Sequence, residues 1–348
     1  MRVFYSGELN ISAGPANVNK LLRKELNRLD KSEIGNKKIS YIKSKNIVLK
    51  QLEVIWKTLT SQVIVYSGTL HVNIISTKIA KLLHKKNIYI MHGCVEFESQ
   101  YNGEPNPKGL QIEQEQMECA DIICGVSKVF MNWIKENYPQ YSQKTYYLTN
   151  GIDWDILDEY KKLVQREKKE QIVVMGGDRK TKMNLQVCQA VQEYNNEHHA
   201  DIKVLIFGKN DPNNEYNRCI RNIPCAKIMG NQSHDIVLRE LSVSKLYVQN
   251  SIFEPFGLAV IEALMCGCNL VISSNVGAKS IFDIDNQFII NDCSSVTLVK
   301  NAIEHGLDEN NNVQILQSID KYKSSGMASA KKLLYLIDRL YKEEEVFF

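Results

Sequence analysis

The sequence predicts an α/β protein of two domains, each built on a parallel sheet covered by helices. The chain has 348 residues, of which 44% are hydrophobic, and this length suits two ordinary domains better than one. Short apolar runs alternate with helical patterns along the whole chain. The runs are apolar throughout, which is typical of parallel strands with both faces covered.

Most strand-like runs end in Gly, Ser or Asn. The first series is 2–7, 63–68, 87–93, 121–127 and 145–151. After the charged stretch 161–171, the second series is 172–177, 202–208, 226–230, 245–250, 269–273 and 287–291. Helical patterns fill the gaps. The order predicts two Rossmann-like domains joined near 152–170, with ligands bound at the carboxyl ends of the strands, in a cleft between facing sheets.

Composition excludes several classes of protein. The charged fraction of 24% indicates a globular chain, and the net charge of only +3 makes nucleic acid an unfavoured partner. No apolar run reaches the length of a membrane span, and the first residues lack the pattern of a secretory signal. The nine cysteines have no paired spacing. We therefore expect free thiols, no zinc site and a cytoplasmic location.

Basic residues are concentrated between positions 20 and 50. Ten Lys or Arg stand there against Glu25, Asp30 and Glu33. Either this surface contacts anionic lipid or an anionic acceptor, at the inner face of a membrane, or it is a solvated helix face with a basic loop. The first reading predicts salt-sensitive binding to anionic vesicles that is lost when Lys37, Lys38, Lys43 and Lys45 are reversed.

Two candidate residues follow strands of the first half. Gly14, before Pro15, opens a predicted helix whose amino end could attract an anion, although a plain strand-turn-helix is the alternative. His92 follows the strand 87–93, where it is either structural or a site residue at the edge of the cleft. The second half has a basic turn, "GGDRKTK", in which Gly177 precedes Arg179 and Lys182. Cations before a helix amino end suit a diphosphate.

The stretch "SIFEPFGLAVIEALMCGCNLVIS" (251–273) places two carboxylates around the start of a buried helix. Glu254 lies on the strand-end loop and Glu262 lies in the helix. Buried charges need partners, so either the cations of the basic turn neutralise them or a ligand uses them.

The pattern E-P-F-G-L-x-x-x-E resembles the E-x7-E motif of retaining GT-B glycosyltransferases of the family-4 type. "TYYLTNGID", "GGDRKTKMN", "LIFGKND" and "VISSNVGA" are similar to further segments of that family, in the same order. The resemblance implies domains at 1–160 (acceptor side) and 165–325 (donor side), with the C-terminal helix 326–348 joined to the first domain. An apolar stripe at 333, 334, 336, 337, 340 and 341 suits that packing.

The resemblance also implies the role of each site residue. Glu262 would bind the ribose of a nucleotide, with UDP favoured, and Arg179 and Lys182 would hold the diphosphate without a metal or other cofactor. Glu254 would contact the donor sugar and His92 would lie by sugar and acceptor. The remaining donor-binding positions are Gly14, Gly177, Phe256, Gly257 and Leu258.

The expected activity is therefore transfer of a hexose, with retained configuration, to a glycan, lipid-linked or protein-linked acceptor. This suits polysaccharide or glycoconjugate biosynthesis. Two alternatives stay open, a sugar-nucleotide epimerase on the same scaffold and a non-catalytic nucleotide-sugar binding protein. Incubation with a nucleotide sugar alone separates transferase from epimerase, because an epimerase converts it without an acceptor.

Overall fold

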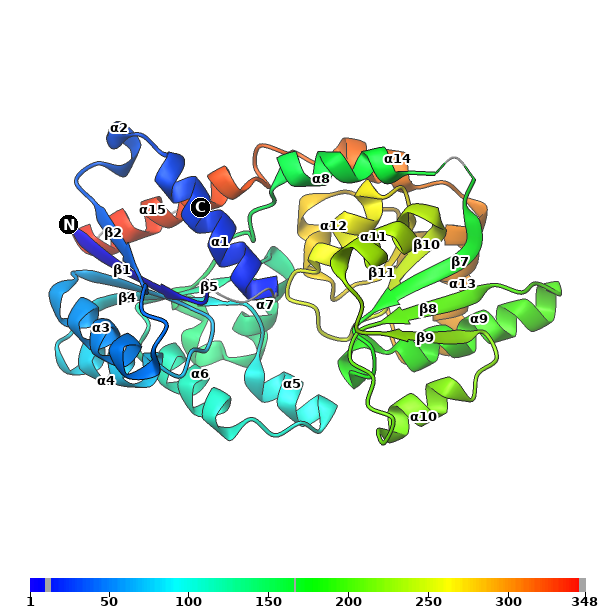
Figure 1. The fold of residues 1–348 in the computed structure, drawn as a ribbon, viewed down its shortest axis with the longest axis horizontal. Coiled ribbons are helices and arrows are strands. Elements are labelled where there is room, and N and C mark those ends of the chain that lie inside the picture. The colour runs from blue at the N-terminus through cyan, green and yellow to red at the C-terminus, as the bar shows by residue number, and fades with distance from the viewer. Residues whose placement is uncertain (10–13, 166, 344–348) are drawn as a thin grey trace. The chain divides into compact units, whose positions relative to one another are not determined.

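A computed structural model describes residues 1–9, 14–165 and 167–343, and the chain forms two compact units (Figure 1). The first unit is Met1–Asp153 with Lys321–Phe348, and the second is Trp154–Asp320. The first boundary lies at Asp153 instead of the expected 160, because helix α8 (Trp154–Tyr160) packs against α12 (Leu258–Met265) of the second unit. The second unit likewise ends before the expected 325.

The first unit contains a six-stranded sheet in the order β2-β1-β3-β4-β5-β6, in which every pair is parallel. Its strands are β1 (Arg2–Gly7), β2 (Lys38–Tyr41), β3 (Val63–Ser67), β4 (Lys86–Met91), β5 (Ile122–Gly125) and β6 (Thr145–Tyr147). Its helices are α1 (Gly14–Arg28), α2 (Lys31–Ile34), α3 (Ile47–Thr60), α4 (Asn73–Leu82), α5 (Val95–Asn102), α6 (Pro107–Cys119), α7 (Lys128–Asn137) and α15 (Gly326–Lys342).

Strand β2 is the one strand of this sheet that the sequence did not predict. It lies at the edge, where it pairs only with β1, and its burial rises from an exposed Lys38 to a buried Tyr41. An edge strand is covered on fewer sides than a central one, so it lacks the continuous apolar run that marks the others. The basic segment 20–50 therefore contains a strand as well as helices and loops.

Helix α15 packs against α1 in the first unit (Figure 1). Its apolar stripe is buried at Leu333, Leu334, Leu336, Ile337 and Leu340, whereas Tyr341 is 49% exposed. An ion pair of 2.8 Å joins Asp338 of α15 to Lys37. Because the Lys37 side chain is only 8% exposed, this lysine is not part of an open basic surface, contrary to the expectation from the sequence.

The second unit contains a second six-stranded parallel sheet, in the order β12-β11-β10-β7-β8-β9. Its strands are β7 (Lys169–Met175), β8 (Lys203–Phe207), β9 (Ala226–Gly230), β10 (Ser244–Gln249), β11 (Asn269–Ser273) and β12 (Ile289–Ile290). Besides α8 and α12, its helices are α9 (Asn184–His198), α10 (Glu215–Arg221), α11 (His234–Val243), α13 (Val296–Asp308) and α14 (Asn312–Ser318).

The core of the second unit lies between its sheet and the helices α9 and α13. Val174, Val204 and Leu246 on the strands pack with Val187 and Ile303 on those helices, all fully buried. The predicted α/β class with two parallel sheets is confirmed. All nine cysteines are free thiols, as expected. Within the described residues, no helix is long and apolar enough to cross a membrane.

Candidate functional site

The turns that follow β7 and β10 meet at one edge of the second sheet. The two strands are neighbours in the sheet, so the carboxyl ends of both point to the same side. The Ile252 amide donates to the Thr181 carbonyl at 3.0 Å, and the Gly277 amide donates to the Glu254 carbonyl at 2.9 Å. The backbone around Glu254 is therefore fixed from both sides.

Lys182 and Glu254 form the central ion pair of this edge. The Lys182 Nζ lies 2.5 Å from Glu254 Oε2, and the two side chains are only 11% and 17% exposed. Gln249 Nε2 donates to the same oxygen at 3.3 Å. The basic turn thus supplies the cation that neutralises the first of the two carboxylates, which is one of the two answers that the sequence left open.

Two glycines make room for this lysine. Gly176 has φ of +102° and Gly177 has φ of +60°, values that favour glycine. A Cβ at position 176 would lie 2.3 Å from Lys182 Cγ, and one at position 177 would lie 2.0 Å from the Lys209 carbonyl oxygen. Any larger residue at either position would displace Lys182 or the turn after β8.

The remaining anion-binding groups of this edge are open. Arg179 is exposed and, within the described chain, forms no ion pair. Helix α12 begins after Gly257 (φ +93°), and no side chain of the described residues caps it, so its first amides are available to a ligand. These amides include that of Leu258. The ring of Phe256 is only 3% exposed, so its side chain supports the loop and only its backbone could meet a ligand.

Glu262 has a partner that the sequence did not identify. Its Oε1 lies 3.1 Å from Nε2 of His234, the first residue of α11. The hydrogen bond that His234 donates to the Glu262 carboxylate raises the pKa of His234, against the opposing effect of burial. The cations of the basic turn therefore neutralise Glu254 and not Glu262. The only available signal was the position of "SHD" at a helix start after β9.

The Lys182–Glu254 pair gives a stability prediction. We expect Lys182→Ala to lower the free energy of unfolding by about 2–3 kcal/mol, because it leaves the Glu254 carboxylate without its cation in a mostly buried place. Thermal or urea unfolding measures this change. The double variant Lys182→Ala/Glu254→Gln removes the stranded charge and should recover at least half of the loss. A double variant as unstable as Lys182→Ala would contradict a direct pairing.

In the first unit, His92 follows β4 and is held by β3. Its Nε2 lies 2.8 Å from Ser67 Oγ, and Ser67 donates its only hydroxyl hydrogen to Asn19 Oδ1 at 2.6 Å. The His92 Nε2 therefore carries the hydrogen and Nδ1 is an acceptor. Burial lowers the pKa of His92 to about 4, so the ring is neutral near pH 7. Within the described residues, Nδ1 has no hydrogen-bond partner.

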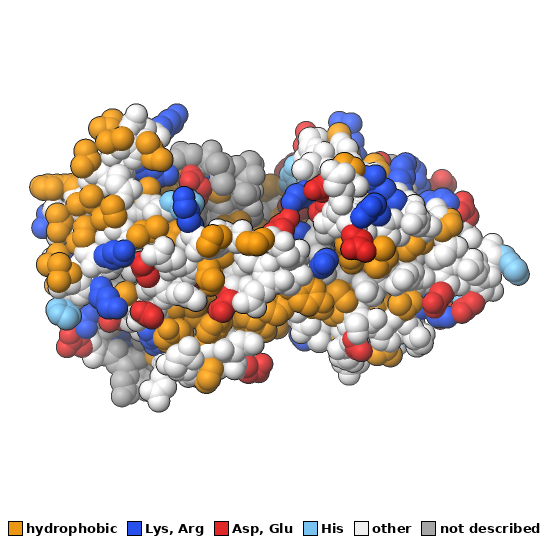
Figure 2. Space-filling view, turned by 90° about the horizontal axis from the view of Figure 1, so that it is seen from below, with side chains coloured by type: hydrophobic (Ala, Val, Ile, Leu, Met, Phe, Trp, Pro, Cys, Tyr) orange, Lys and Arg blue, Asp and Glu red, His pale blue; other side chains and the backbone are white. Residues whose placement is uncertain are grey.

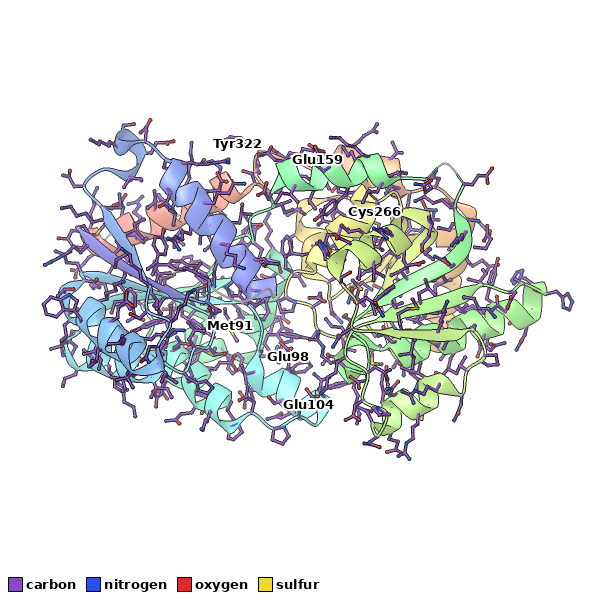
Figure 3. All side chains as sticks on the ribbon, viewed as in Figure 1. Met91, Glu98, Glu104, Glu159, Cys266 and Tyr322 are labelled. Atoms are coloured by element: carbon purple, nitrogen blue, oxygen red, sulfur yellow. The ribbon has the colours of Figure 1, made fainter. Side chains whose placement is uncertain are left out.

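A buried carboxylate fastens the chain just after His92. Glu113 of α6 accepts hydrogen bonds from the amides of Val95 (2.8 Å) and Glu96 (3.1 Å), at the amino end of α5. Burial raises the pKa of Glu113 to about 7. Figure 3 marks Met91 at the end of β4 and Glu98 on α5, which lie on either side of this turn. Glu113 could not be predicted as part of this site because it lies far from His92 along the chain.

These two groups give opposite pH effects on stability. The unfolded chain binds a proton at His92 below about 6.5, but the folded chain binds it only near 4. The contribution of His92 to the free energy of unfolding therefore falls as the pH falls from 6.5 to 4. Glu113 titrates near 7 when folded and near 4.5 when unfolded, so its contribution falls as the pH rises from 4.5 to 7.

We expect His92→Gln to make the free energy of unfolding rise less steeply with pH between 4 and 6.5, and Glu113→Gln to make it rise more steeply between 4.5 and 7. Each change amounts to about 3 kcal/mol across its window. Urea unfolding at a series of pH values measures both slopes. Equal slopes in the wild type and both variants would contradict the assigned protonation states.

Gly14 begins α1 and is exposed, with no heavy atom within 4 Å of a Cβ built there. The same helix carries Asn19, which accepts hydrogen bonds from Tyr5 and Ser67. The loop that precedes Gly14 includes residues 10–13, which lie outside the described residues. The donor-binding role of Gly14 therefore stays a prediction.

Several solved structures are similar to this chain in fold over almost its whole length. The fold is similar to that of Anabaena HepE in complex with UDP and glucose (TM-score 0.69, 12% identity, covering 97% of this chain and 99% of the other). It is also similar to the catalytic domain of Arabidopsis thaliana starch synthase IV bound to ADP and acarbose (0.66, 13%, 98% and 99%). These neighbours define a GT-B fold of two Rossmann-like domains.

A weaker likeness is to a putative UDP-N-acetylglucosamine 2-epimerase from Listeria monocytogenes (TM-score 0.52, 11% identity, covering 100% of this chain and 99% of the other). Residues 155–322 match the family described as "Glycosyl transferases group 1". The matched residues lie almost wholly within the second unit, and they include the Lys182–Glu254 pair and Glu262. No curated protein matches the sequence.

Proposed function

We propose that this protein is a retaining, metal-independent glycosyltransferase that moves a hexose from a nucleoside diphosphate sugar to an acceptor. One observation carries the proposal. At one edge of the group 1 domain, the open guanidinium of Arg179, the Lys182–Glu254 pair and the uncapped amino end of α12 converge. Such an arrangement suits a diphosphate next to a sugar.

The charged groups at this edge of the sheet contact different parts of the donor. Lys182 and Glu254 neutralise each other, so the charge of a diphosphate falls mainly on Arg179 and on the amides of Gly257 and Leu258. Glu254, which precedes α12, contacts hydroxyls of the sugar. Glu262 lies further along, within α12, and contacts the ribose. Gly177 permits the approach of the turn, and Gly14, the first residue of α1, is a further donor-binding position in the proposal.

The chemistry is electrostatic. The leaving diphosphate gains negative charge as the sugar gains oxocarbenium character, and fixed cations and amides stabilise that separation without reorganising. His92 is neutral near pH 7, and in the proposed arrangement it lies by the sugar and the acceptor without adding a charge. Neither glutamate needs to form a covalent intermediate, which fits front-face attack and a retained configuration.

The proposed acceptor is a glycan, a lipid-linked or a protein-linked sugar, as in polysaccharide or glycoconjugate biosynthesis, with the enzyme acting in the cytoplasm. Peripheral contact with an anionic membrane through residues 20–50 belongs to the same proposal. Because Lys37 pairs with Asp338, that contact depends on Lys38, Lys43 and Lys45, which are exposed.

A panel of nucleotide sugars tests the function. In a thermal-shift assay with UDP-, GDP- and ADP-sugars, we expect one nucleotide series to raise the melting temperature, with UDP favoured. Turnover of that donor should persist in EDTA, because cations and amides of the protein replace a metal ion. No shift with any member of the panel, or activity that needs an added divalent ion, would contradict the respective part of the proposal.

A sugar-nucleotide epimerase is the second candidate, favoured by the structural likeness to the putative 2-epimerase. The two candidates differ when the donor is supplied alone. An epimerase converts the nucleotide sugar to its epimer without an acceptor. The transferase that we propose does not epimerise the sugar. Without an acceptor it releases free nucleotide only slowly, by hydrolysis of the donor.

A further inference from the structure

Helix α3 presents six of its apolar side chains outward and its charged side chains inward. The apolar residues on its outer side are strongly exposed: Ile47 76%, Val48 63%, Leu49 58%, Leu52 59%, Trp56 67% and Leu59 45%. The charged side chains Lys50, Glu53 and Lys57 are only 20%, 16% and 16% exposed. A surface helix of a soluble protein has the reverse arrangement, so this outer face is suited to contact with something apolar.

The exposed face extends to the end of the neighbouring helix. Lys85 Nζ donates to the carbonyls of Leu59 (3.0 Å) and Ser61 (2.9 Å), which places the end of α4 beside the end of α3. There Leu82 is 78% and Leu83 46% exposed. Figure 2 shows hydrophobic side chains gathered at the end of the molecule where α3 and α4 lie in Figure 1. We call these eight residues of α3 and the α4 end the α3 patch.

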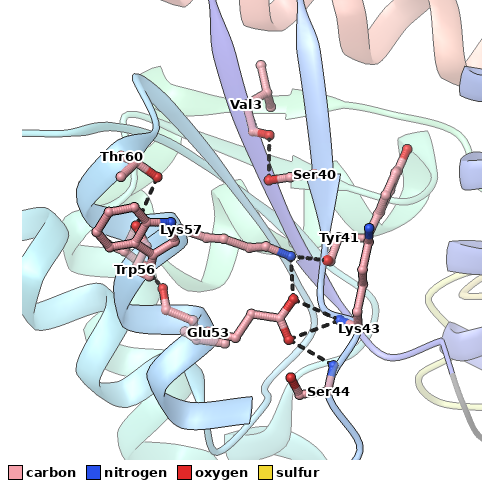
Figure 4. Close-up of polar contacts among 11 residues, drawn as sticks. Val3, Ser40, Tyr41, Lys43, Ser44, Glu53, Trp56, Lys57 and Thr60 are labelled. Carbon is pink, nitrogen blue, oxygen red and sulfur yellow. Dashed lines mark hydrogen bonds and ion pairs between the residues drawn. The ribbon is translucent and has the colours of Figure 1, made fainter. Parts of the chain in front are cut away.

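No negative charge of α3 lies on the patch. Glu53 is the only acidic residue of the helix. Its carboxylate accepts the amides of Lys43 (3.1 Å) and Ser44 (2.8 Å) and pairs with Lys57 Nζ at 2.5 Å (Figure 4). These hydrogen bonds lower the pKa of Glu53 to about 2 despite its burial. The carboxylate is therefore turned inward and neutralised by groups of the same unit.

Lysines border both ends of the patch. Lys43 and Lys45, just before α3, are exposed and form no ion pair within the described residues. Lys81, beside Leu82, is 67% exposed and lies 3.7 Å from its partner Glu118. An apolar face that carries a tryptophan and is bordered by lysines matches the boundary between lipid head groups and acyl chains, where anionic head groups would neutralise both ends.

From this geometry we infer that the α3 patch is a membrane-binding surface, by which the first unit inserts into the head-group layer of an anionic bilayer. The same charges disfavour a second copy as the occupant. In an antiparallel pair of α3 helices, the lysines at one end of each copy would meet the lysines at the other end of its partner. The inference extends the membrane contact proposed above for residues 20–50 to the apolar face of α3. It does not depend on the transferase activity, because it concerns a surface of the first unit alone.

The test uses the full chain and vesicles of phosphatidylcholine, with or without phosphatidylglycerol. We expect co-sedimentation with the anionic vesicles, weakened by salt, and a blue shift of the Trp56 fluorescence on binding. The variant Val48→Ser/Leu52→Ser/Trp56→Ser should bind at least tenfold more weakly. Because all three side chains are exposed, its unfolding transition should stay near that of the wild type.

Two further variants sharpen the outcome. Leu298→Ser/Val313→Ser removes exposed apolar side chains from the second unit (45% and 58% exposed) and should leave vesicle binding unchanged. Lys43→Glu/Lys45→Glu should remove the preference for anionic over neutral vesicles. The inference is overturned if the wild type does not bind anionic vesicles, or if the triple variant binds as well as the wild type. It is also overturned if sedimentation shows that the wild type forms a dimer that does not bind lipid, and that only the triple variant is a monomer.

Discussion

Replacing Glu254 with glutamine is expected to lower turnover by on the order of a hundredfold or more, while free nucleoside diphosphate binds almost normally. The carboxylate is 2.5 Å from Lys182 Nζ, so the substitution removes a fixed negative charge from beside the reacting sugar and frees the lysine. The shape of the side chain is kept, and in the proposed arrangement the nucleotide half of the donor does not touch it. Initial rates and calorimetric titration of the diphosphate measure the two effects separately.

A surface carboxylate of the same unit provides the control. The side chain of Glu170 is 62% exposed and pairs with Lys245. The variant Glu170→Gln should keep both the normal turnover and the normal affinity for the diphosphate. The account of Glu254 is wrong if Glu254→Gln turns over at the normal rate. It is also wrong if the affinity for the free diphosphate falls as far as the turnover does.

Replacing Glu262 with alanine is expected to weaken binding of the nucleoside diphosphate by about ten- to a hundredfold. Hydrogen bonds from hydroxyls to a charged carboxylate contribute roughly 1.5–3 kcal/mol, and the ribose would lose them. The same calorimetric titration measures this effect. Loss of affinity without loss of turnover at saturating donor would fit a residue that binds the nucleotide and does not touch the sugar.

His234 is the control for this second result. Its Nε2 lies 3.1 Å from Glu262 Oε1, so in the proposed arrangement it would compete with the ribose for the carboxylate. His234→Ala should therefore bind the diphosphate as tightly as the wild type or more tightly. A loss as large as that of Glu262→Ala would assign the nucleotide contact to the histidine and contradict the role given to Glu262.

The parts of the fold that the sequence predicts are those determined by local apolar pattern. Central strands such as β3 and β8 are apolar on both faces, and the structure has them within a residue or so of the expected bounds. The edge strand β2 was missed because one side of it needs no apolar cover. The open apolar face of α3 was also missed, because the pattern of a buried helix and that of a helix facing lipid are the same along the chain.

The site was predictable only in part, where the interacting groups directly follow strands. The cations at 179–182 and the carboxylate at 254 come from turns that the order of strands brings together, so a cation for Glu254 could be expected. The pairing of Glu262 with His234, that of His92 with Ser67, and that of Glu113 with the amides of Val95 and Glu96 each depend on how separate elements pack together. The sequence gives their residue types but not which helix turns toward which strand end.

Hydrogen exchange with and without the bound nucleoside diphosphate tests the location of the donor site most directly, because it needs no substitution. We expect slower exchange in peptides that cover 176–183 and 252–262, where the free amides at the start of α12 would become hydrogen-bonded. Peptides from the buried core of β8 and α9 should be unchanged. Slower exchange only within residues 1–153, or none at saturating nucleotide, would contradict a donor site at the carboxyl edge of the second sheet.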